Sequence, residues 1–408
     1  MKILIISPYY APYSEVGAVR MISLTDYLSK QGYDVTVYCL SEEELLKESY
    51  GKMSTPIPEG VKVIRFKSMQ KKIPLIEDYL RGKAFARQVF KDINFSQYDI
   101  VLCSCGPYYT LECLPQVKKK TDILFIIDFR DLGAINYRPS LRREERKSSG
   151  LKNWIKANVA GRLEIAREKK AIQYTDLAIA VSDIDREKLQ AAYEAPASKF
   201  CVITNGYDEE KLRDLPEAES NSSITAAVFG KFMYYSQPRA VAILKAIQKL
   251  RIDGFDIQLL HIGQQYPWIE ESITNERIDS DCYRGLGLMD YRDGMAIISK
   301  ADFFVVEDTS PDDVGTKIYD YIFFNRPVIA AVPPDIPLSK LVLSFKNGFA
   351  CDTYDEIFNA MCTVIKEELR ELDPDIHVDM YSRKHKNEEF LQAIIDVISH
   401  KPEKRGSK

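Results

Sequence analysis

The stretch DFFVVEDTSPDDVGTKIYDYIFFNRPVIAAV, residues 302–332, changes its hydrophobic periodicity twice. It starts with an apolar run of strand length, passes through a polar turn, continues with apolar residues at helical spacing and ends in a second apolar run. Two buried strands joined by a helix form a βαβ unit, and such units build parallel sheets. The stretch therefore predicts an α/β fold with a parallel sheet.

The same alternation extends outward over the whole chain. RMISLTDYLSKQG, residues 20–32, has apolar residues at helical spacing and a glycine where the helix should stop. A boundary between two doubly wound halves is expected after VITNGYD (202–208), where the polar stretch LPEAESNSS (215–223) begins. The strand candidates are residues 2–7, 34–40, 61–66, 99–105, 123–129, 177–182, 200–205, 225–230, 257–263, 281–287, 302–307 and 327–332.

Length and composition favour a soluble protein of about two domains. The chain has 408 residues, of which 45% are hydrophobic and 28% charged. The opening MKILIISPYYAP has an apolar run shorter than the roughly 7–15 residues of a secretory signal, so it is interpreted as a first buried strand. No apolar stretch approaches the ~20 residues of a membrane span, so a cytoplasmic protein is expected.

The sequence offers little for a metal site. Its eight cysteines form no CxxC pair, and none of its four histidines stands beside a cysteine. The acidic pattern DSD at 279–281 occurs at chance frequency in a chain with 60 acidic residues. We therefore expect reduced, buried cysteines and no metal cofactor.

The formal net charge of −4 hides an asymmetry between the two halves. Residues 1–205 carry 32 Lys and Arg against 25 Asp and Glu, a net +7, whereas the remainder carries 24 against 35, a net −11. Basic patches attract anionic partners, including phospholipid headgroups and phosphorylated substrates. The first half is therefore the part expected to contact such partners.

The loops that follow the strands are the places to look for chemistry, because ligands of open α/β sheets bind at the carboxyl ends of strands. The loop 7–20 has one glycine and no GxGxxG turn, which disfavours a nicotinamide or flavin enzyme. Its Gly17 stands at a helix start, where backbone N–H groups can meet a phosphate. Asp128, Arg130 and Asp131 end an apolar run, and we expect them to line the cleft.

The helix expected at TKIYDYIFF (316–324) presents two opposite charges. Lys317, Asp320 and Tyr321 stand at positions i, i+3 and i+4 and share one face. The helix therefore aims a cation and an anion at the strand ends. Asp312 precedes Asp320 by eight residues, a spacing that carries weight only because of the strand, loop and helix around it.

The segment DDVGTKIYDYIFFNRPVIA, residues 312–330, resembles a motif of glycosyltransferase family 4, in which two acidic residues separated by seven others precede EYxxxGxPVI. Here both glutamates are aspartates and the usual glycine is Asn325. Residues 7–40, DFRD at 128–131 and ITNGYD at 203–208 are similar to other parts of the family, so the resemblance covers almost the whole chain.

This resemblance implies a GT-B fold, with two Rossmann-like doubly wound domains facing a central cleft. Residues 1–206 would form the N-terminal, acceptor-side domain, and residues 207–380 the domain that binds a nucleotide sugar. Residues 381–400 resemble the family's terminal helix, which crosses back to the first domain.

The resemblance also implies roles for single residues. The family usually has Arg and Lys about five residues apart after the strand at 225–230 to neutralise the diphosphate. Here Lys231 is followed by a glutamine or Arg239, and Lys317 would supply the missing charge. Gly17 would approach the donor phosphates, Leu288 and Met289 the base, and Asp320 the ribose hydroxyls. The candidates for catalysis are Asp131, Asp312 and Lys231, and those for donor binding are Gly17, Arg130, Leu288, Met289, Gly315, Thr316, Lys317 and Asp320.

The leading hypothesis is a glycosyltransferase that moves a sugar from a nucleotide-diphosphate sugar to an acceptor hydroxyl, with retention, in cell-surface polysaccharide or glycan assembly. The expected partners are this donor, a glycan or lipid-linked acceptor and an anionic membrane surface, and not nucleic acid. Such a protein would be cytoplasmic and peripheral at the inner face of the membrane. Two alternatives stay open: a GT-B nucleotide-sugar epimerase, and a catalytically weak glycosyltransferase-like binding partner.

Overall fold

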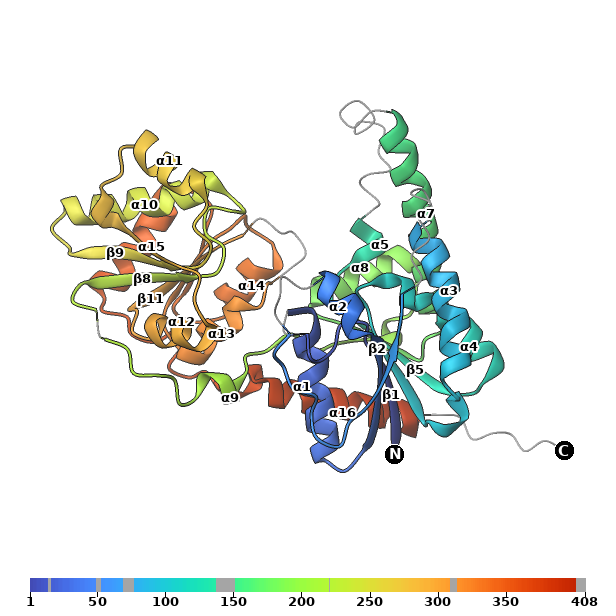
Figure 1. The fold of residues 1–408 in the computed structure, drawn as a ribbon. Helices are drawn as coiled ribbons and strands as arrows, with labels where there is room; N and C mark the ends of the chain where they lie inside the picture. Colours follow the sequence, from blue (N-terminus) through green and yellow to red (C-terminus); the bar gives the residue numbers. More distant parts are fainter. Residues whose placement is uncertain are drawn as a thin grey trace. The chain divides into compact units, whose positions relative to one another are not determined.

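A computed structural model describes residues 1–13, 16–48, 53–68, 77–136, 151–219, 221–308 and 314–400. The chain divides into two units (Figure 1). Unit 1 comprises Met1–Thr204 and Lys386–Lys408, and unit 2 comprises Asn205–His385. Each unit contains one parallel sheet with helices on both faces, which confirms the predicted fold class of two doubly wound α/β halves.

The sheet of unit 1 has seven strands in the order β3-β2-β1-β4-β5-β6-β7, and every neighbouring pair is parallel. In register, Ile3 of β1 lies opposite Val35 of β2 and Ile100 of β4. The strands are β1 (Lys2–Ile6), β2 (Asp34–Leu40), β3 (Lys62–Phe66), β4 (Ile100–Ser104), β5 (Leu124–Phe129), β6 (Leu177–Ala180) and β7 (Phe200–Val202).

Alternate residues of these strands enter two different cores. Leu4 and Ile6 of β1 belong to one apolar cluster, whereas Ile3 and Ile5 belong to the other. Because both faces of the sheet are covered, the strands are apolar runs rather than alternating ones. The helices of unit 1 are α1 (Val16–Lys30), α2 (Glu42–Glu48), α3 (Glu77–Asp92), α4 (Leu114–Lys120), α5 (Gly133–Asn136), α7 (Leu151–Tyr174) and α8 (Asp183–Tyr193).

The last helix, α16 (Arg383–Ser399), covers the same face of the unit 1 sheet as α1 (Figure 1). Its Phe390 and Ile394 are fully or almost fully buried in that core. The Asn387 side-chain amide donates hydrogen bonds of 2.9 and 3.1 Å to the hydroxyl and carbonyl of Ser23 in α1. Although α16 follows unit 2 in sequence, its residues from Lys386 onward therefore belong to unit 1.

The sheet of unit 2 has six parallel strands in the order β10-β9-β8-β11-β12-β13. One face is covered by α10, α11 and α15 and the other by α12, α13 and α14 (Figure 1). The strands are β8 (Ile224–Phe229), β9 (Ile257–Ile262), β10 (Tyr283–Gly287), β11 (Phe303–Glu307), β12 (Val328–Ala331) and β13 (Gly348–Cys351). The helices are α9 (Glu209–Leu212), α10 (Gln237–Ile252), α11 (Pro267–Asn275), α12 (Tyr291–Ile298), α13 (Lys317–Phe324), α14 (Pro337–Leu343) and α15 (Tyr354–Lys366).

All twelve strands expected from the sequence are present, and β13 is an addition. This strand pairs with β12 at the edge of the sheet, and only Cys351 of its four residues is buried. Its four residues, GFAC, are apolar, but a run this short has no readable periodicity, so the sequence pattern did not reveal the strand.

Candidate functional site

The order of the strands in unit 2 reverses at β8, since β9 lies on one side of β8 and β11 on the other. Ligands of open α/β sheets bind beyond the carboxyl ends of the strands at such a point. Residues 230–236, which connect β8 to α10, are called the lysine loop below because they carry Lys231. The lysine loop and the beginning of α13 both follow strands of this central region.

Lys231 is exposed, and its ammonium group lies 4.2 Å from the centre of the Tyr234 ring and 5.4 Å from that of Tyr235. Both rings are themselves exposed, at 48% and 42%. An ammonium over an aromatic face is attracted by the ring quadrupole and keeps its charge. The candidate cation expected in this loop is therefore available to solvent and to anions.

Lys317 approaches the lysine loop from α13. Its ammonium nitrogen lies 4.5 Å from the centre of the Phe229 ring and 5.3 Å from that of Tyr291. A Cβ atom built on Gly230 would lie 3.7 Å from the Lys317 Cε, so the lysine stem passes directly over this glycine. Gly230 has φ of +104°, a conformation that favours glycine. The structure thus brings Lys317 against the residue that precedes Lys231.

The other cation expected as a partner of Lys231 is engaged elsewhere. The Arg239 guanidinium forms an ion pair with Asp352, with 2.9 Å between Nε and Oδ1. Arg239 also lies within the first turn of α10, after the Ser236 N-cap. Lys317, rather than Arg239, is therefore the second cation near Lys231 at the end of β8.

Asp320 lies on α13 one turn after Lys317, as the helical spacing predicted, but it is only 6% exposed. Its Oδ1 accepts a hydrogen bond of 2.8 Å from the Tyr291 hydroxyl. Burial raises the pKa of this carboxyl, while Lys317 and the Tyr291 hydrogen bond lower it. The two charged side chains of α13 therefore flank Tyr291, with the cation against the ring and the carboxylate on the hydroxyl.

The remaining candidates of unit 2 stand shortly before α13 or α12 in the chain. Gly315 and Thr316 directly precede α13, and Gly315 has φ of +71°. Leu288 is 78% exposed, whereas Met289 packs against the core two residues before Tyr291. Asp312 lies outside the described residues.

In unit 1 the candidates Gly17, Arg130 and Asp131 lie at the carboxyl ends of β1 and β5. The Arg130 guanidinium donates hydrogen bonds to the carbonyls of Cys105 (2.9 Å), Gly106 (2.6 Å) and Gly17. It therefore ties together the loops that follow β1, β4 and β5. Asp131 is exposed, and its backbone carbonyl accepts a hydrogen bond of 2.9 Å from the Tyr108 hydroxyl.

The expectation that Asp128 lines a cleft is wrong, because this residue is completely buried. Its carboxylate pairs with Arg20, with 3.1 Å between Nη2 and Oδ1. The same guanidinium donates to the carbonyls of Ile203 and Thr204, each at 2.7 Å, and lies 4.7 Å from the centre of the Phe390 ring. Asp128 thus belongs to an internal network that holds β5, the residues after β7 and α16 together.

Three residues that matter here were not singled out from the sequence: Tyr291, His261 and Glu307. The His261 ring is buried, and its Nε2 donates to the Gly230 carbonyl at 2.9 Å, because a carbonyl can only accept. Burial lowers the pKa of this histidine. Glu307 accepts hydrogen bonds from the lysine loop. Two of them could have been found from their positions in the sequence, because His261 and Glu307 both stand at the carboxyl ends of strands next to β8.

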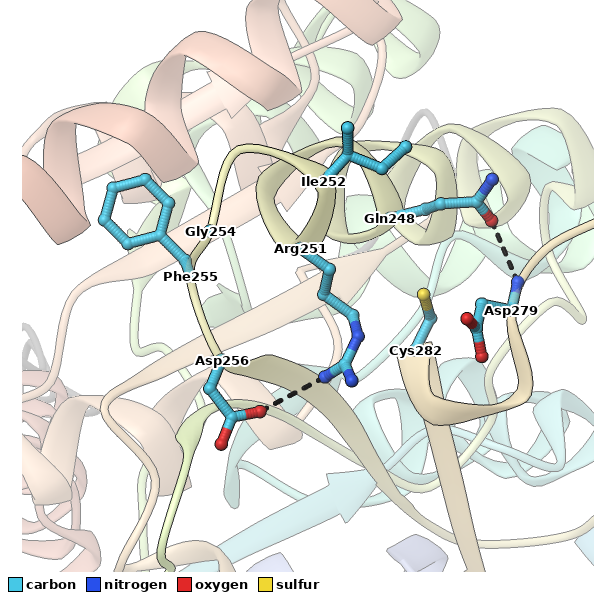
Figure 2. Close-up of a pocket in the computed structure, with 8 residues that line it drawn as sticks. All are labelled: Gln248, Arg251, Ile252, Gly254, Phe255, Asp256, Asp279 and Cys282. Atoms are coloured by element: carbon cyan, nitrogen blue, oxygen red, sulfur yellow. Dashed lines mark hydrogen bonds and ion pairs between the residues drawn. The ribbon is translucent and has the colours of Figure 1, made fainter.

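A surface pocket of about 410 Å³ lies elsewhere on unit 2, between the end of α10 and the beginnings of β9 and β10 (Figure 2). Its charged side chains are engaged in ion pairs or hydrogen bonds within the protein. Arg251 donates to Asp256 (3.3 Å), to Asp281 (3.4 Å) and to the Ile257 carbonyl (2.9 Å). Because the pocket lies at the amino ends of the strands, we do not assign it to the candidate site.

Among the residues that the structure describes, no three or more His, Cys, Asp or Glu side chains gather as a metal site would require. Nor does any helix in the described ranges combine the length and apolarity needed to cross a membrane.

Residues 17–211 match the protein family described as Glycosyltransferase Family 4. None of the curated proteins compared with the chain matches it significantly. In structure the chain is similar to sucrose-phosphate synthase from Thermosynechococcus elongatus, with a TM-score of 0.67 and 14% sequence identity over 98% of this chain and 99% of that one.

It is also similar to Anabaena HepE in complex with UDP-glucose, with a TM-score of 0.61 and 14% identity over 97% of this chain and 100% of that one. A third similar structure is a putative UDP-N-acetylglucosamine 2-epimerase from Listeria monocytogenes, with a TM-score of 0.58 and 12% identity over 98% and 96% of the two chains. Likeness at these identities establishes the fold.

Proposed function

Since the chain has the GT-B fold and its residues 17–211 match glycosyltransferase family 4, we propose that it transfers a sugar from a nucleoside-diphosphate sugar to an acceptor hydroxyl. One observation carries this proposal: Lys317 lies against Gly230, next to the exposed Lys231, at the carboxyl end of β8. Two ammonium groups at that point suit a diphosphate. A diphosphate is present in the UDP-glucose bound to HepE and in the UDP-N-acetylglucosamine that gives the similar epimerase its name.

In the proposed reaction the bond between the sugar's anomeric carbon and the diphosphate breaks, and a bond to the acceptor oxygen forms. The acceptor loses its proton, and the nucleoside diphosphate leaves with the bonding electrons. The transition state resembles an oxocarbenium ion, so negative charge develops on the leaving diphosphate. Lys231 and Lys317 stabilise that charge in place, as preorganised cations do. Donor binding then does not depend on a divalent metal.

We assign the donor to unit 2 and the acceptor to the side of unit 1. Asp320 offers a carboxylate to the ribose, and Leu288 with Met289 provides the neighbouring contact for the base. In unit 1, Gly17 and Arg130 are proposed to approach the phosphates. Asp131 and Asp312 are proposed to act near the transferred sugar, with retention of its anomeric configuration.

The proposed setting is cell-surface polysaccharide or glycan assembly in the cytoplasm, at the inner face of the membrane. The support is the basic first half of the chain, with a net charge of +7 over residues 1–205, which suits an anionic lipid surface and a glycan or lipid-linked acceptor.

A nucleotide-sugar epimerase is the second candidate, because the putative UDP-N-acetylglucosamine 2-epimerase from Listeria monocytogenes has a similar fold. The geometry of unit 2 favours the transferase. Its buried histidine, His261, is bonded to the Gly230 carbonyl and to the Tyr283 hydroxyl (2.7 Å), so it is engaged inside the unit rather than directed at a sugar.

The deciding experiment incubates the purified chain with UDP-glucose and, separately, with UDP-N-acetylglucosamine, and follows the products by NMR. A transferase releases UDP slowly by hydrolysis in the absence of an acceptor, and an α-anomeric product accompanies retention. An epimerase instead converts the sugar while it stays attached to UDP. A protein that binds UDP but gives neither product is a binding partner, and the transferase proposal then fails.

A further inference from the structure

Glu307 is the last residue of β11, and it is a carboxylate almost without solvent contact, only 3% exposed. Its two oxygens accept hydrogen bonds from the backbone N–H groups of Ser236 (2.8 Å), Tyr234 (3.1 Å) and Tyr235 (3.4 Å). These donors form the second half of the lysine loop. A buried carboxylate is costly unless hydrogen bonds satisfy it, and here three N–H groups do so.

The topology explains why this contact exists. β11 pairs directly with β8, with Phe303 opposite Ala226 and Phe304 opposite Ala227. The end of β11 therefore reaches the loop that leaves β8. The same N–H groups precede α10, whose N-terminus favours an anion through the helix dipole. The carboxylate of Glu307 occupies the place at this N-terminus that an anion would favour.

The lysine loop is held at two further points. The His261 ring donates to the carbonyl of Gly230, and the Trp268 indole donates to the carbonyl of Met233 at 2.8 Å. Met233 is buried and has φ of +58°, a conformation that persists in a residue of this kind only where the surroundings fix it. The backbone is thus anchored at both ends and in the middle, while Lys231 stays exposed.

We propose that Glu307 is a positioning residue: by holding the backbone of Tyr234, Tyr235 and Ser236, it fixes the loop that presents Lys231 and so sets the affinity for the donor diphosphate. This inference rests on the proposed function, since it assigns Lys231 to the diphosphate. Glu307 acts only through the loop, because its own oxygens are taken up by backbone N–H groups.

The test uses the full chain, with UDP as the probe in isothermal titration calorimetry at pH 8. The variant is Glu307→Gln, which removes the charge and replaces one carboxylate oxygen by an amide NH2. This NH2 group cannot accept hydrogen bonds from the backbone N–H groups that it faces. The matched control is Glu356→Gln, because Glu356 also accepts two backbone N–H bonds at the start of a unit 2 helix, from Asp352 (2.7 Å) and Thr353 (3.1 Å). We expect UDP affinity to fall about tenfold in Glu307→Gln and to stay unchanged in the control.

A double-mutant cycle separates positioning from a merely structural role. If Glu307 acts through Lys231, the loss caused by Glu307→Gln disappears when Lys231 is already alanine. Hydrogen exchange of the peptide covering the lysine loop should accelerate in Glu307→Gln and not in the control. Independent, additive losses or unchanged exchange overturn the inference.

Failure of the two proposals gives different results. If the wild-type chain does not bind UDP, the proposed function fails and this inference falls with it. If the wild type binds UDP and Glu307→Gln binds it equally well, the inference alone fails. Should Glu307→Gln not fold, Glu307→Asp takes its place in the same cycle, because it keeps the charge but withdraws it from the loop by one methylene.

Discussion

The hydroxyl of Tyr291 donates a hydrogen bond of 2.8 Å to the carboxylate of Asp320, and the two residues come from different helices, α12 and α13. The Tyr291 ring also lies 5.3 Å from the ammonium of Lys317. Burial raises the pKa of the Tyr291 hydroxyl and that of the Asp320 carboxyl. The charged face of α13 is therefore organised by a residue of another helix.

The first prediction concerns Asp320. If its carboxylate accepts hydrogen bonds from the donor ribose, Asp320→Ala weakens UDP binding about ten- to a hundredfold, because a charge-assisted hydrogen bond contributes roughly 1.5–3 kcal/mol. Tyr291→Phe is the control, since it removes the internal hydrogen bond and keeps the carboxylate. Calorimetry with UDP decides between two roles: equal losses in the two variants would mean that Asp320 acts only by holding Tyr291.

Lys317 and Lys231 give a prediction about the diphosphate alone. Lys317→Met and Lys231→Met should each weaken UDP binding about tenfold or more and leave binding of uridine unchanged, because uridine has no phosphate. Lys245→Met is the matched control, since Lys245 is a lysine of the same unit that pairs with Glu276. Adding EDTA should leave the UDP affinity of the wild type unchanged. A loss on chelation would contradict the proposal that donor binding does not depend on a divalent metal.

There are physical reasons why some features of this protein could be predicted from its sequence and others could not. Most of the runs that became β1 to β12 could be predicted because strands buried on both faces are apolar throughout. The edge strands β3 and β10 are more exposed and less apolar, with Arg65 and Arg284 among their residues. The pairing of Lys317 and Asp320 on one helical face was also visible, since the helical repeat places residues i and i+3 together.

Contacts between distant residues could not be predicted in this way. Tyr291 meets Asp320 across 29 positions, and Glu307 meets Ser236 across 71. Nothing in the local sequence of Glu307 distinguishes a loop anchor from a solvated carboxylate at a strand end. The burial of Asp128 had the same cause, because its partner Arg20 lies 108 positions earlier. Only the sheet order brings these residues together.

The buried pair of Arg20 and Asp128 predicts a stability effect. Their side chains are 9% and 0% exposed. Arg20→Met leaves Asp128 charged and unpaired, so we expect the free energy of unfolding to fall by about 3–5 kcal/mol. Adding Asp128→Asn removes that charge and should restore part of the loss. Urea unfolding of both variants measures this; a double variant as unstable as Arg20→Met would mean that the lost bonds to the Ile203 and Thr204 carbonyls dominate.

The basic first half predicts binding to anionic vesicles. Co-sedimentation should be stronger with vesicles of phosphatidylglycerol than with vesicles of phosphatidylcholine, and it should weaken as the salt concentration rises, because exposed charges are screened over about 8–10 Å at physiological ionic strength. Binding that depends on neither the lipid charge nor the salt would argue against the electrostatic interpretation.

The last prediction concerns Glu307 and pH. Burial, with a smaller contribution from the neighbouring Asp308, raises the pKa of this carboxyl from its ordinary 4.5 to about 7, against the lowering effect of the three N–H groups. Between these two values the folded protein holds a proton that the unfolded chain has released. The contribution of Glu307 to stability is therefore present at low pH and lost as the pH rises through about 7.

Urea unfolding of the wild type and of Glu307→Gln between pH 5 and 8 tests this directly. The stability of the wild type relative to the variant should fall over this range by on the order of 2 kcal/mol, since one pKa unit corresponds to about 1.4 kcal/mol. Glu356 behaves differently, because backbone N–H groups lower the pKa of its exposed carboxyl. It is largely ionised in both states over most of this range, so the difference between the wild type and Glu356→Gln should stay nearly constant. A constant difference for Glu307→Gln as well would mean that Glu307 keeps an ordinary pKa despite its burial.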